Sequence, residues 1–213
     1  MKVKICGITN REDAVWALND GAQFIGVDFR KRSRRRVQLA AAKDWVPTLP
    51  TFASVVGLFE DERPERIAQL AAELNLKGIQ LNGPQTPERL MEVWRALGLA
   101  EVPPFIIKGL AVPGPETLDD IPRWGKTIDY VLLYDPKEGE GGAGTFDWSL
   151  AAAAAARGKP VFLGGGLTAE NVREAVAKGA PFGVDVTAGV ERLTRRKDHD
   201  KMRAFITSAL LGR

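Results

Sequence analysis

Two side chains that could exchange protons with a substrate follow apolar runs with the composition of buried strands. Cys6 ends the run VKIC before Gly7, and Asp135 directly follows YVLLY. An unperturbed thiol titrates near pH ~8.5, close enough to neutrality for Cys6 to accept a proton if positive charge lies nearby. Each residue also has a plainer interpretation, because a lone cysteine often fills an apolar strand and Asp-Pro is a common turn pair. Their position in the fold must therefore decide between proton transfer and a purely structural role.

Three further segments could bind anions. LGGGL (163–167) and DVTAGVE (185–191) follow the last two apolar runs and bring small residues to places where backbone N–H groups can contact a phosphate. One such loop often only turns the chain, but two at these positions favour phosphate binding. The run RKRSRRRV (30–37) has the densest charge in the chain. Such a run is usually a solvated face, whereas above an active site its guanidinium groups would match a carboxylate.

Composition argues against several other functions. The chain has 213 residues, 45% of them hydrophobic, and a net charge of +3, which gives little support to nucleic-acid binding. Its single cysteine cannot form an internal disulfide or a zinc site, and its single histidine, His199, lies in the charged stretch KDHDK. No apolar run approaches the roughly 18 residues of a membrane-spanning helix, and no cleaved signal is recognisable. We expect a cytoplasmic protein with no membrane or nucleic-acid partner.

The elements that would position these residues repeat along the whole chain. Short β-branched runs alternate with amphipathic stretches, which is the pattern of βα units with a parallel sheet. The expected strands cover residues 3–6, 24–29, 53–59, 78–81, 105–108, 130–134, 161–164 and 183–186. Eight strands favour a closed (β/α)8 barrel over an open doubly wound sheet, which at this length more commonly has about five to seven. In a barrel, the carboxyl ends of all strands meet at one face.

Three local features modify this pattern. The fifth crossover, residues 112–125, contains three prolines and leaves room for only about two or three helical turns, so we expect it to be irregular. GEGGAG (139–144) matches G-x-G-x-x-G, but it follows the sixth strand instead of the first, and we interpret it as a flexible loop without a nucleotide. Thr168 is the expected N-cap of the helix that follows the seventh strand.

These motifs together resemble the phosphoribosylanthranilate isomerases, the tryptophan-pathway members of the phosphate-binding (β/α)8 barrels. The resemblance covers almost the whole chain and rests on the segments KICGIT, GAQFIG, S-x-R-x-V (33–37), IQLNG, VLLYD, FDWSL, GGGLTAENV and GVDVTAGVE. Each segment alone is weak, but their order and spacing place each one at an expected strand end. The resemblance implies an α/β fold that is a single (β/α)8 TIM barrel of the ribulose-phosphate-binding type over residues 1–213.

The resemblance also implies roles for individual residues. Cys6 matches the family's general base, Asp135 its general acid, and Arg35 the arginine that holds the anthranilate carboxylate. The residues that match the phosphate-binding segments are Gly165, Gly166, Ala188 and Gly189. The implied reaction is the Amadori rearrangement of N-(5-phosphoribosyl)anthranilate, a small sugar phosphate, to 1-(2-carboxyphenylamino)-1-deoxyribulose 5-phosphate. It needs no metal ion or cofactor, because the cationic imine formed from the substrate is itself an electron sink.

The chain differs from the family's usual pattern at three places. Asn82 replaces a histidine after the fourth strand, and Asp28 stands where an apolar or amide residue is usual and could repel the anthranilate. One residue, Thr145, separates GGAG from FDW where two are common. Two alternative functions remain: a related sugar-phosphate isomerase of histidine biosynthesis, whose chemistry usually uses two aspartates, and a non-catalytic phosphate-binding barrel. The sequence leaves open whether the protein is a monomer or a homodimer.

Overall fold

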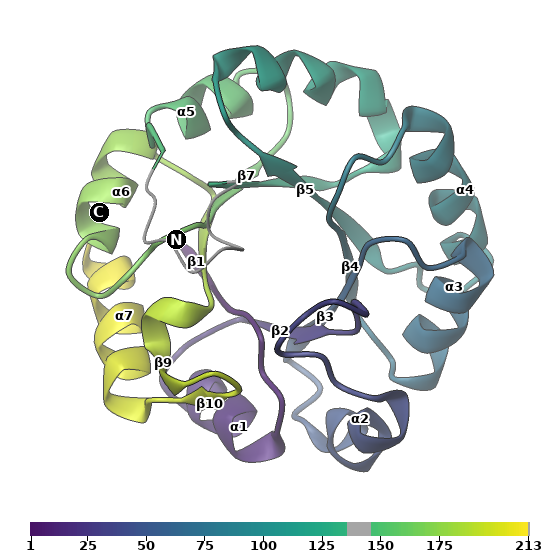
Figure 1. Ribbon diagram of the computed structural model, residues 1–213, viewed down its shortest axis with the longest axis horizontal. Helices are drawn as coiled ribbons and strands as arrows, with labels where there is room; N and C mark the ends of the chain where they lie inside the picture. Colours follow the sequence, from purple (N-terminus) through teal and green to yellow (C-terminus); the bar gives the residue numbers. More distant parts are fainter. Residues whose placement is uncertain (136–145, 213) are drawn as a thin grey trace.

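All eight expected runs form parallel strands, and these close into one barrel (Figure 1). Each strand pairs with the next along the chain, and β8 pairs back with β1. The computed structural model describes residues 1–135 and 146–212. The strands are β1 (Lys2–Ile5), β2 (Phe24–Asp28), β3 (Ser54–Phe59), β4 (Gly78–Leu81), β5 (Phe105–Ala111), β6 (Tyr130–Tyr134), β7 (Val161–Leu163) and β8 (Gly183–Val186). The predicted (β/α)8 barrel is confirmed.

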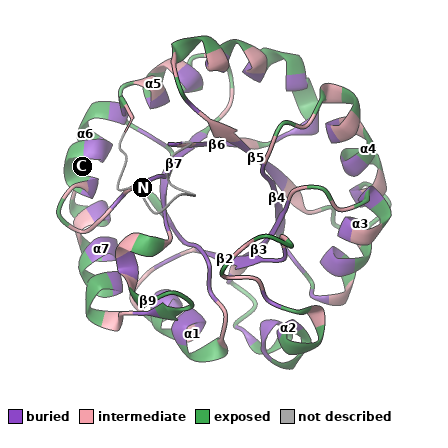
Figure 2. Ribbon diagram, in the orientation of Figure 1, coloured by how far each residue is buried: buried purple, intermediate pink, exposed green. Residues whose placement is uncertain are grey.

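Helices surround the barrel, with buried inner faces and exposed outer faces (Figure 2). No helix in the described ranges is long and apolar enough to cross a membrane. Prolines begin two of the helices, where the missing N–H has no helical partner to lose. The helices are α1 (Arg11–Asn19), α2 (Leu39–Trp45), α3 (Pro64–Glu73), α4 (Pro87–Leu97), α5 (Leu150–Ala155), α6 (Val172–Gly179) and α7 (His199–Leu211), with short 3-10 turns η1 (Val46–Thr48) and η4 (Ala188–Val190). A small hairpin of β9 (Glu191–Leu193) and β10 (Arg196–Lys197) follows β8.

Two of the local expectations can be compared with the structure. The fifth crossover is irregular as predicted: it is a 3-10 segment, η2 (Pro115–Thr127), with a break at Gly125. The N-cap prediction for Thr168 is wrong, because α6 begins only at Val172. The side chain of Asn171 accepts from the Thr168 N–H at 2.8 Å and donates to the Gly166 carbonyl at 2.9 Å, which holds the preceding residues in a turn. The GEGGAG segment and Thr145 lie outside the described residues.

The core has two parts, separated by the wall of the barrel. The larger part lies between the strands and the helices. The smaller part fills the barrel interior and consists of the buried side chains Phe24, Val56, Ile107, Leu132 and Phe162. Because successive residues of a strand face opposite sides, these positions fix which residues point inward. Most inward-facing residues nearer the carboxyl ends are polar, Leu58 being an exception, so the apolar layer forms the floor of any site above it.

Lys108 faces the helix layer instead of the barrel interior, although it is only 2% exposed. Its ammonium group donates to the carbonyl oxygens of Gly109 at 2.5 Å and Gly83 at 2.8 Å, and lies 5.6 Å from the centre of the Trp124 ring. Burial lowers the pKa of Lys108 to about 8, and the negative charge of Asp120 offsets this only in part. The charged form is therefore retained at neutral pH at a cost in folding free energy.

We expect this cost to be visible as a pH dependence of stability. The pKa of Lys108 is lower in the folded state than in the unfolded chain, where it is near ~10.4, so the unfolded state binds more protons between these values. The free energy of unfolding should therefore rise between about pH 8 and pH 10 by about 2–3 kcal/mol more in the wild type than in Lys108→Met. Urea titrations at several pH values measure this difference. Lys77→Met, which removes an exposed lysine, should follow the wild type, and parallel curves for all three proteins would contradict the prediction.

Candidate active site

A cavity of about 450 Å³ opens at the carboxyl ends of the strands, the face where (β/α)8 barrels place their chemistry. Strands β1, β2, β3, β4, β6 and β8, or the residues directly after them, contribute to its wall. Of the predicted site residues, Cys6, Arg35 and Ala188 line this cavity. Asp135 and the three predicted glycines are not among its lining residues, and they lie around the neighbouring ends of β6, β7 and β8.

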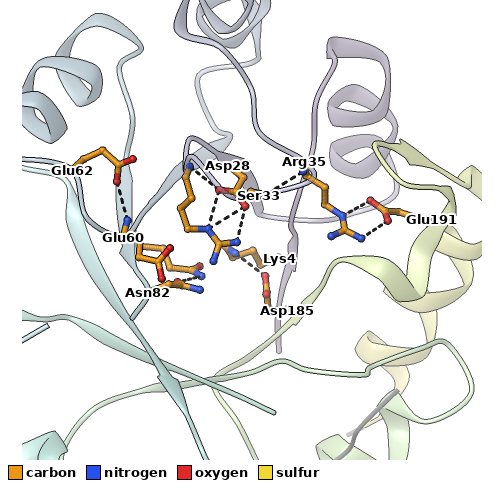
Figure 3. A network of polar contacts seen from close by, with 11 residues as sticks. Lys4, Asp28, Ser33, Arg35, Glu60, Glu62, Asn82, Asp185 and Glu191 are labelled. Atoms are coloured by element: carbon orange, nitrogen blue, oxygen red, sulfur yellow. Dashed lines mark hydrogen bonds and ion pairs between the residues drawn. The ribbon is translucent and has the colours of Figure 1, made fainter. Parts of the chain in front are cut away.

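Cys6 follows β1 and its side chain points into the barrel, above a buried ion pair. The ammonium group of Lys4 lies 2.7 Å from a carboxylate oxygen of Asp185 (Figure 3). Gly26 on β2 leaves the space in which both side chains fit, because a Cβ there would lie 2.8 Å from the Cys6 Sγ and 3.2 Å from the Lys4 Nζ. Burial raises the pKa of Cys6, and the positive charge of Lys4 opposes that increase.

Asp28, the acidic residue expected to repel an anionic substrate, is paired with Arg30. The Arg30 Nη2 lies 2.6 Å from one carboxylate oxygen of Asp28, and the Nε lies 3.0 Å from the other. The Asp28 side chain is buried, so this pairing replaces the water that it would otherwise need. The charge of Asp28 is therefore compensated within the protein before any ligand arrives.

Arg35 already binds a carboxylate of the protein. Its Nε and Nη2 donate to the two carboxylate oxygens of Glu191 at 2.7 Å and 2.6 Å, in the bidentate geometry that guanidinium groups favour (Figure 3). Gly7 has a φ of +69°, and a Cβ there would lie 2.5 Å from the Arg35 Cδ, so glycine lets the arginine pack against the chain. Glu191 was not predicted, because nothing local in the sequence links it to a residue 156 positions earlier.

Asp135 is buried directly after β6, next to the loop that follows β7. A Cβ at Gly165 would lie 2.7 Å from the Asp135 backbone nitrogen and 3.5 Å from the Asp135 Cβ, so glycine permits this close approach. The residue that β6 contributes to the cavity wall is Tyr134, which continues the inward-facing series of Tyr130 and Leu132. Tyr134 was missed in the sequence, although the two-residue period of a strand could have indicated it.

The glycine loops after β7 and β8 touch each other. Gly165 and Gly166 have φ values of +81° and +64°, which favour glycine. A Cβ at Gly189 would lie only 2.0 Å from the Leu167 carbonyl oxygen, so a side chain there would push the two loops apart. Within the described ranges, the amides of Gly165 and Gly166 donate to no backbone carbonyl, and Ala188 and Gly189 begin η4, where the first N–H groups of a helical turn have no partner in that turn. Clustered amides of this kind suit a phosphate group.

Asn82, which differs from the family's usual residue, also lies in the cavity wall. Its side-chain oxygen accepts from the Gln80 amide at 2.9 Å, and both residues are buried. Gly109 on β5 leaves room for Asn82, because a Cβ there would lie 2.8 Å from the same oxygen. Within the described ranges, no group of three or more His, Cys, Asp or Glu side chains could hold a metal ion.

Comparisons with known proteins agree over nearly the full chain. The family model described as N-(5'-phosphoribosyl)anthranilate (PRA) isomerase matches residues 3–208. The N-(5'-phosphoribosyl)anthranilate isomerase of Geobacter sp. strain M21 is 39% identical over 209 residues, which are 98% of this chain and 97% of that protein. The solved phosphoribosyl anthranilate isomerase of Thermotoga maritima has 34% identity and a TM-score of 0.88, with 99% of this chain and 98% of that chain covered. A phosphoribosyl anthranilate isomerase solved in complex with reduced 1-(o-carboxyphenylamino)-1-deoxyribulose 5-phosphate has 33% identity and a TM-score of 0.85, over 99% of this chain and 98% of that chain.

Gly189→Ala tests whether contact between the two glycine loops forms the anion site. The added methyl group would collide with the Leu167 carbonyl oxygen, so we expect a loss of about 1–3 kcal/mol in the free energy of unfolding and at least tenfold weaker binding of inorganic phosphate. Urea unfolding and calorimetric titration measure the two effects. Gly164→Ala is the matched control, because a Cβ there makes only ordinary contacts at 3.5 Å. Equal phosphate affinity in both variants would show that the loops do not bind phosphate.

Proposed function

The chain belongs to the N-(5'-phosphoribosyl)anthranilate isomerase family, and from this premise we propose how its residues carry out the reaction. The protein converts N-(5'-phosphoribosyl)anthranilate to 1-(2-carboxyphenylamino)-1-deoxyribulose 5-phosphate in tryptophan biosynthesis. The full-length match to enzymes of this one activity carries the conclusion. The two alternatives from the sequence, a histidine-pathway isomerase and a non-catalytic barrel, are therefore set aside.

In the proposed mechanism, Asp135 acts as general acid and Cys6 as general base. Asp135 protonates the furanose ring oxygen, and the C1–O bond breaks to give a protonated Schiff base between C1 and the anthranilate nitrogen. Cys6 then removes the proton from C2, and the C–H electron pair moves toward the cationic imine. The resulting enolamine tautomerises to the ketone product. Each proton transfer contributes about 10²–10⁴ in rate.

The two ends of the substrate are proposed to bind on opposite sides of the reacting atoms. The phosphate would accept hydrogen bonds from the amides of Gly165, Gly166, Ala188 and Gly189, which belong to the two touching loops after β7 and β8. Arg35, in the cavity wall, would bind the anthranilate carboxylate. Holding both ends leaves the sugar carbons little freedom, so positioning supplies much of the remaining acceleration.

We also propose that the protein works in the cytoplasm, as a monomer or a homodimer. A reducing compartment suits a chain whose single cysteine is proposed to act as a base. Among the related structures, one describes monomers generated from a dimeric phosphoribosylanthranilate isomerase of Thermotoga maritima. Sedimentation of the purified protein would distinguish the two states.

Cys6→Ser and Asp135→Asn test the proposed roles. We expect each substitution to lower kcat by two or more orders of magnitude with little change in fold, because each removes one proton-transfer group. Loss of substrate fluorescence measures turnover, and circular dichroism checks the fold. Near-normal turnover in either variant would contradict the role assigned to that residue.

Tyr134→Phe is the matched control for Asp135→Asn, because Tyr134 is the residue of this strand end that lines the cavity. If Asp135 is the acid, removal of the Tyr134 hydroxyl should lower kcat less than tenfold. A large loss in Tyr134→Phe together with a small loss in Asp135→Asn would instead assign the proton to the phenol.

Arg35→Ala tests carboxylate binding. We expect KM to rise by at least tenfold with a smaller change in kcat, because a charge-assisted hydrogen bond from the guanidinium group would be lost from the bound state. Arg36→Ala is the control, since Arg36 lines a separate cavity between α2 and α3. Steady-state kinetics of both variants measure the effect, and an unchanged KM in Arg35→Ala would show that another basic residue holds the carboxylate.

A further inference from the structure

Lys4 lies beneath Cys6 in the barrel interior, and its side chain has no exposed surface. Both residues point inward from the same strand end, and both approach the space left by Gly26, where a Cβ would lie 2.8 Å from the thiol sulfur and 3.2 Å from the ammonium nitrogen. The sulfur and the ammonium group are therefore neighbours. The Asp185 carboxylate, on the adjacent strand β8, lies 2.7 Å from the ammonium group and limits where that group can lie.

The charges around Cys6 come from four elements. Lys4 on β1 and Lys197 on β10 favour the thiolate, whereas Asp185 on β8 and Asp28 on β2 disfavour it. Asp28 is already paired with Arg30, and Lys197 lies 2.8 Å from the Thr187 carbonyl oxygen and 3.5 Å from Glu191. Lys4 has the largest effect among the charged neighbours. The other titratable residues of the same cavity wall are Glu60, Arg32, Arg34, Arg35 and Tyr134.

Lys4 remains charged in this setting. Burial alone would lower its pKa, but the attraction of Asp185 and of the ionised Cys6, together with hydrogen bonds to both, outweighs burial, and the pKa is raised. A buried thiol meets the opposite problem, because burial disfavours its charged form. A fixed ammonium ion beside the sulfur is the group that can offset this cost.

We propose that Lys4 is a positioning residue that stabilises the thiolate of Cys6, and that Asp185 orients the Lys4 ammonium group while limiting its effect. This inference rests on the proposed role of Cys6 as the base. Lys4 takes no proton from the substrate and touches none of its atoms. It lowers the free energy of the ionised base, so that more of the enzyme is ready to remove the C2 proton at neutral pH.

Lys4→Met tests this proposal without relying on activity. Cys6 is the only cysteine in the chain, so the ultraviolet absorbance of the thiolate and the rate of alkylation by iodoacetamide both report on this residue alone. We expect the midpoint of Cys6 ionisation to rise by at least one pH unit, which is at least a tenfold lower thiolate fraction at neutral pH. Lys2→Met, which removes an exposed charge two residues earlier on the same strand, should leave the midpoint unchanged.

Asp185→Asn should shift the midpoint in the opposite direction, because it removes a negative charge near the sulfur. A structural loosening of the site would shift the Cys6 midpoint in the same direction in both variants. Shifts of opposite sign therefore distinguish an electrostatic effect from a loss of packing. If Lys4→Met fails to fold with Asp185 unpaired, the double variant Lys4→Met/Asp185→Asn removes both charges. Its midpoint should still rise, by less than in Lys4→Met alone. An unchanged midpoint in a folded variant that lacks Lys4 would overturn the proposal. Shifts of the same sign in Lys4→Met and Asp185→Asn would also overturn it.

The pH profile of kcat/KM separates this proposal from the proposed function. If both hold, kcat/KM of Lys4→Met falls at least tenfold at neutral pH and recovers as the pH is raised, following the ionisation midpoint. If the midpoint moves but the kcat/KM profile does not follow, Lys4 still stabilises the thiolate and the role of Cys6 as base is wrong. If kcat/KM falls at all pH values with an unmoved midpoint, the role assigned to Lys4 is wrong.

Discussion

The pairing of β1 with β8 is the contact on which the candidate site depends, because it joins the first and last strands of the barrel. Lys4 aligns with Asp185, and the Cys6 N–H donates to the Val186 carbonyl oxygen at 2.8 Å. Closing a sheet over so long a segment costs chain entropy, but this cost grows only slowly with loop length. In this register, alternate residues of both strands face the interior, so the thiol and the ion pair beneath it share one space. An error of one residue in the register would turn them toward the helices.

The fold was predictable because its signal is local and repeated. Each strand is a short β-branched run, and its boundaries agree with the structure to within a residue or two except for β5, which continues to Ala111. The irregular fifth crossover was also predictable, since proline removes donors wherever it occurs. The start of α6 was not, because the side chain of Asn171 holds a turn that competes with the helix. Such competition depends on a loop geometry that residue types alone do not determine.

The same distinction between local signals and long-range contacts applies to the candidate site. Strand ends and glycine loops indicated Cys6, Asp135 and the segments proposed to bind the phosphate, and the structure places Cys6 in the cavity wall. The partners of the charged residues could not be predicted, because Arg35 and Glu191 meet only when β8 and the hairpin after it close over the loop that follows β2. Tyr134 is a different case, because the two-residue alternation along β6 is a local signal that places Tyr134 on the same side as the inward-facing Leu132.

The charges of the candidate site are compatible with an anionic substrate, although its cavity contains several carboxylates. Lys4, Arg30 and Arg35 each pair with an acid of the protein, so these buried or half-buried cations contribute geometry more than net charge. Exposed arginines such as Arg32 and Arg34 line the same opening, and their field reaches about a Debye length into the solvent. The exposed arginines thus attract an anion, whereas the paired cations position it. A guanidinium group oriented by a protein carboxylate is a rigid donor, and rigidity lets a modest charge discriminate one carboxylate position from another.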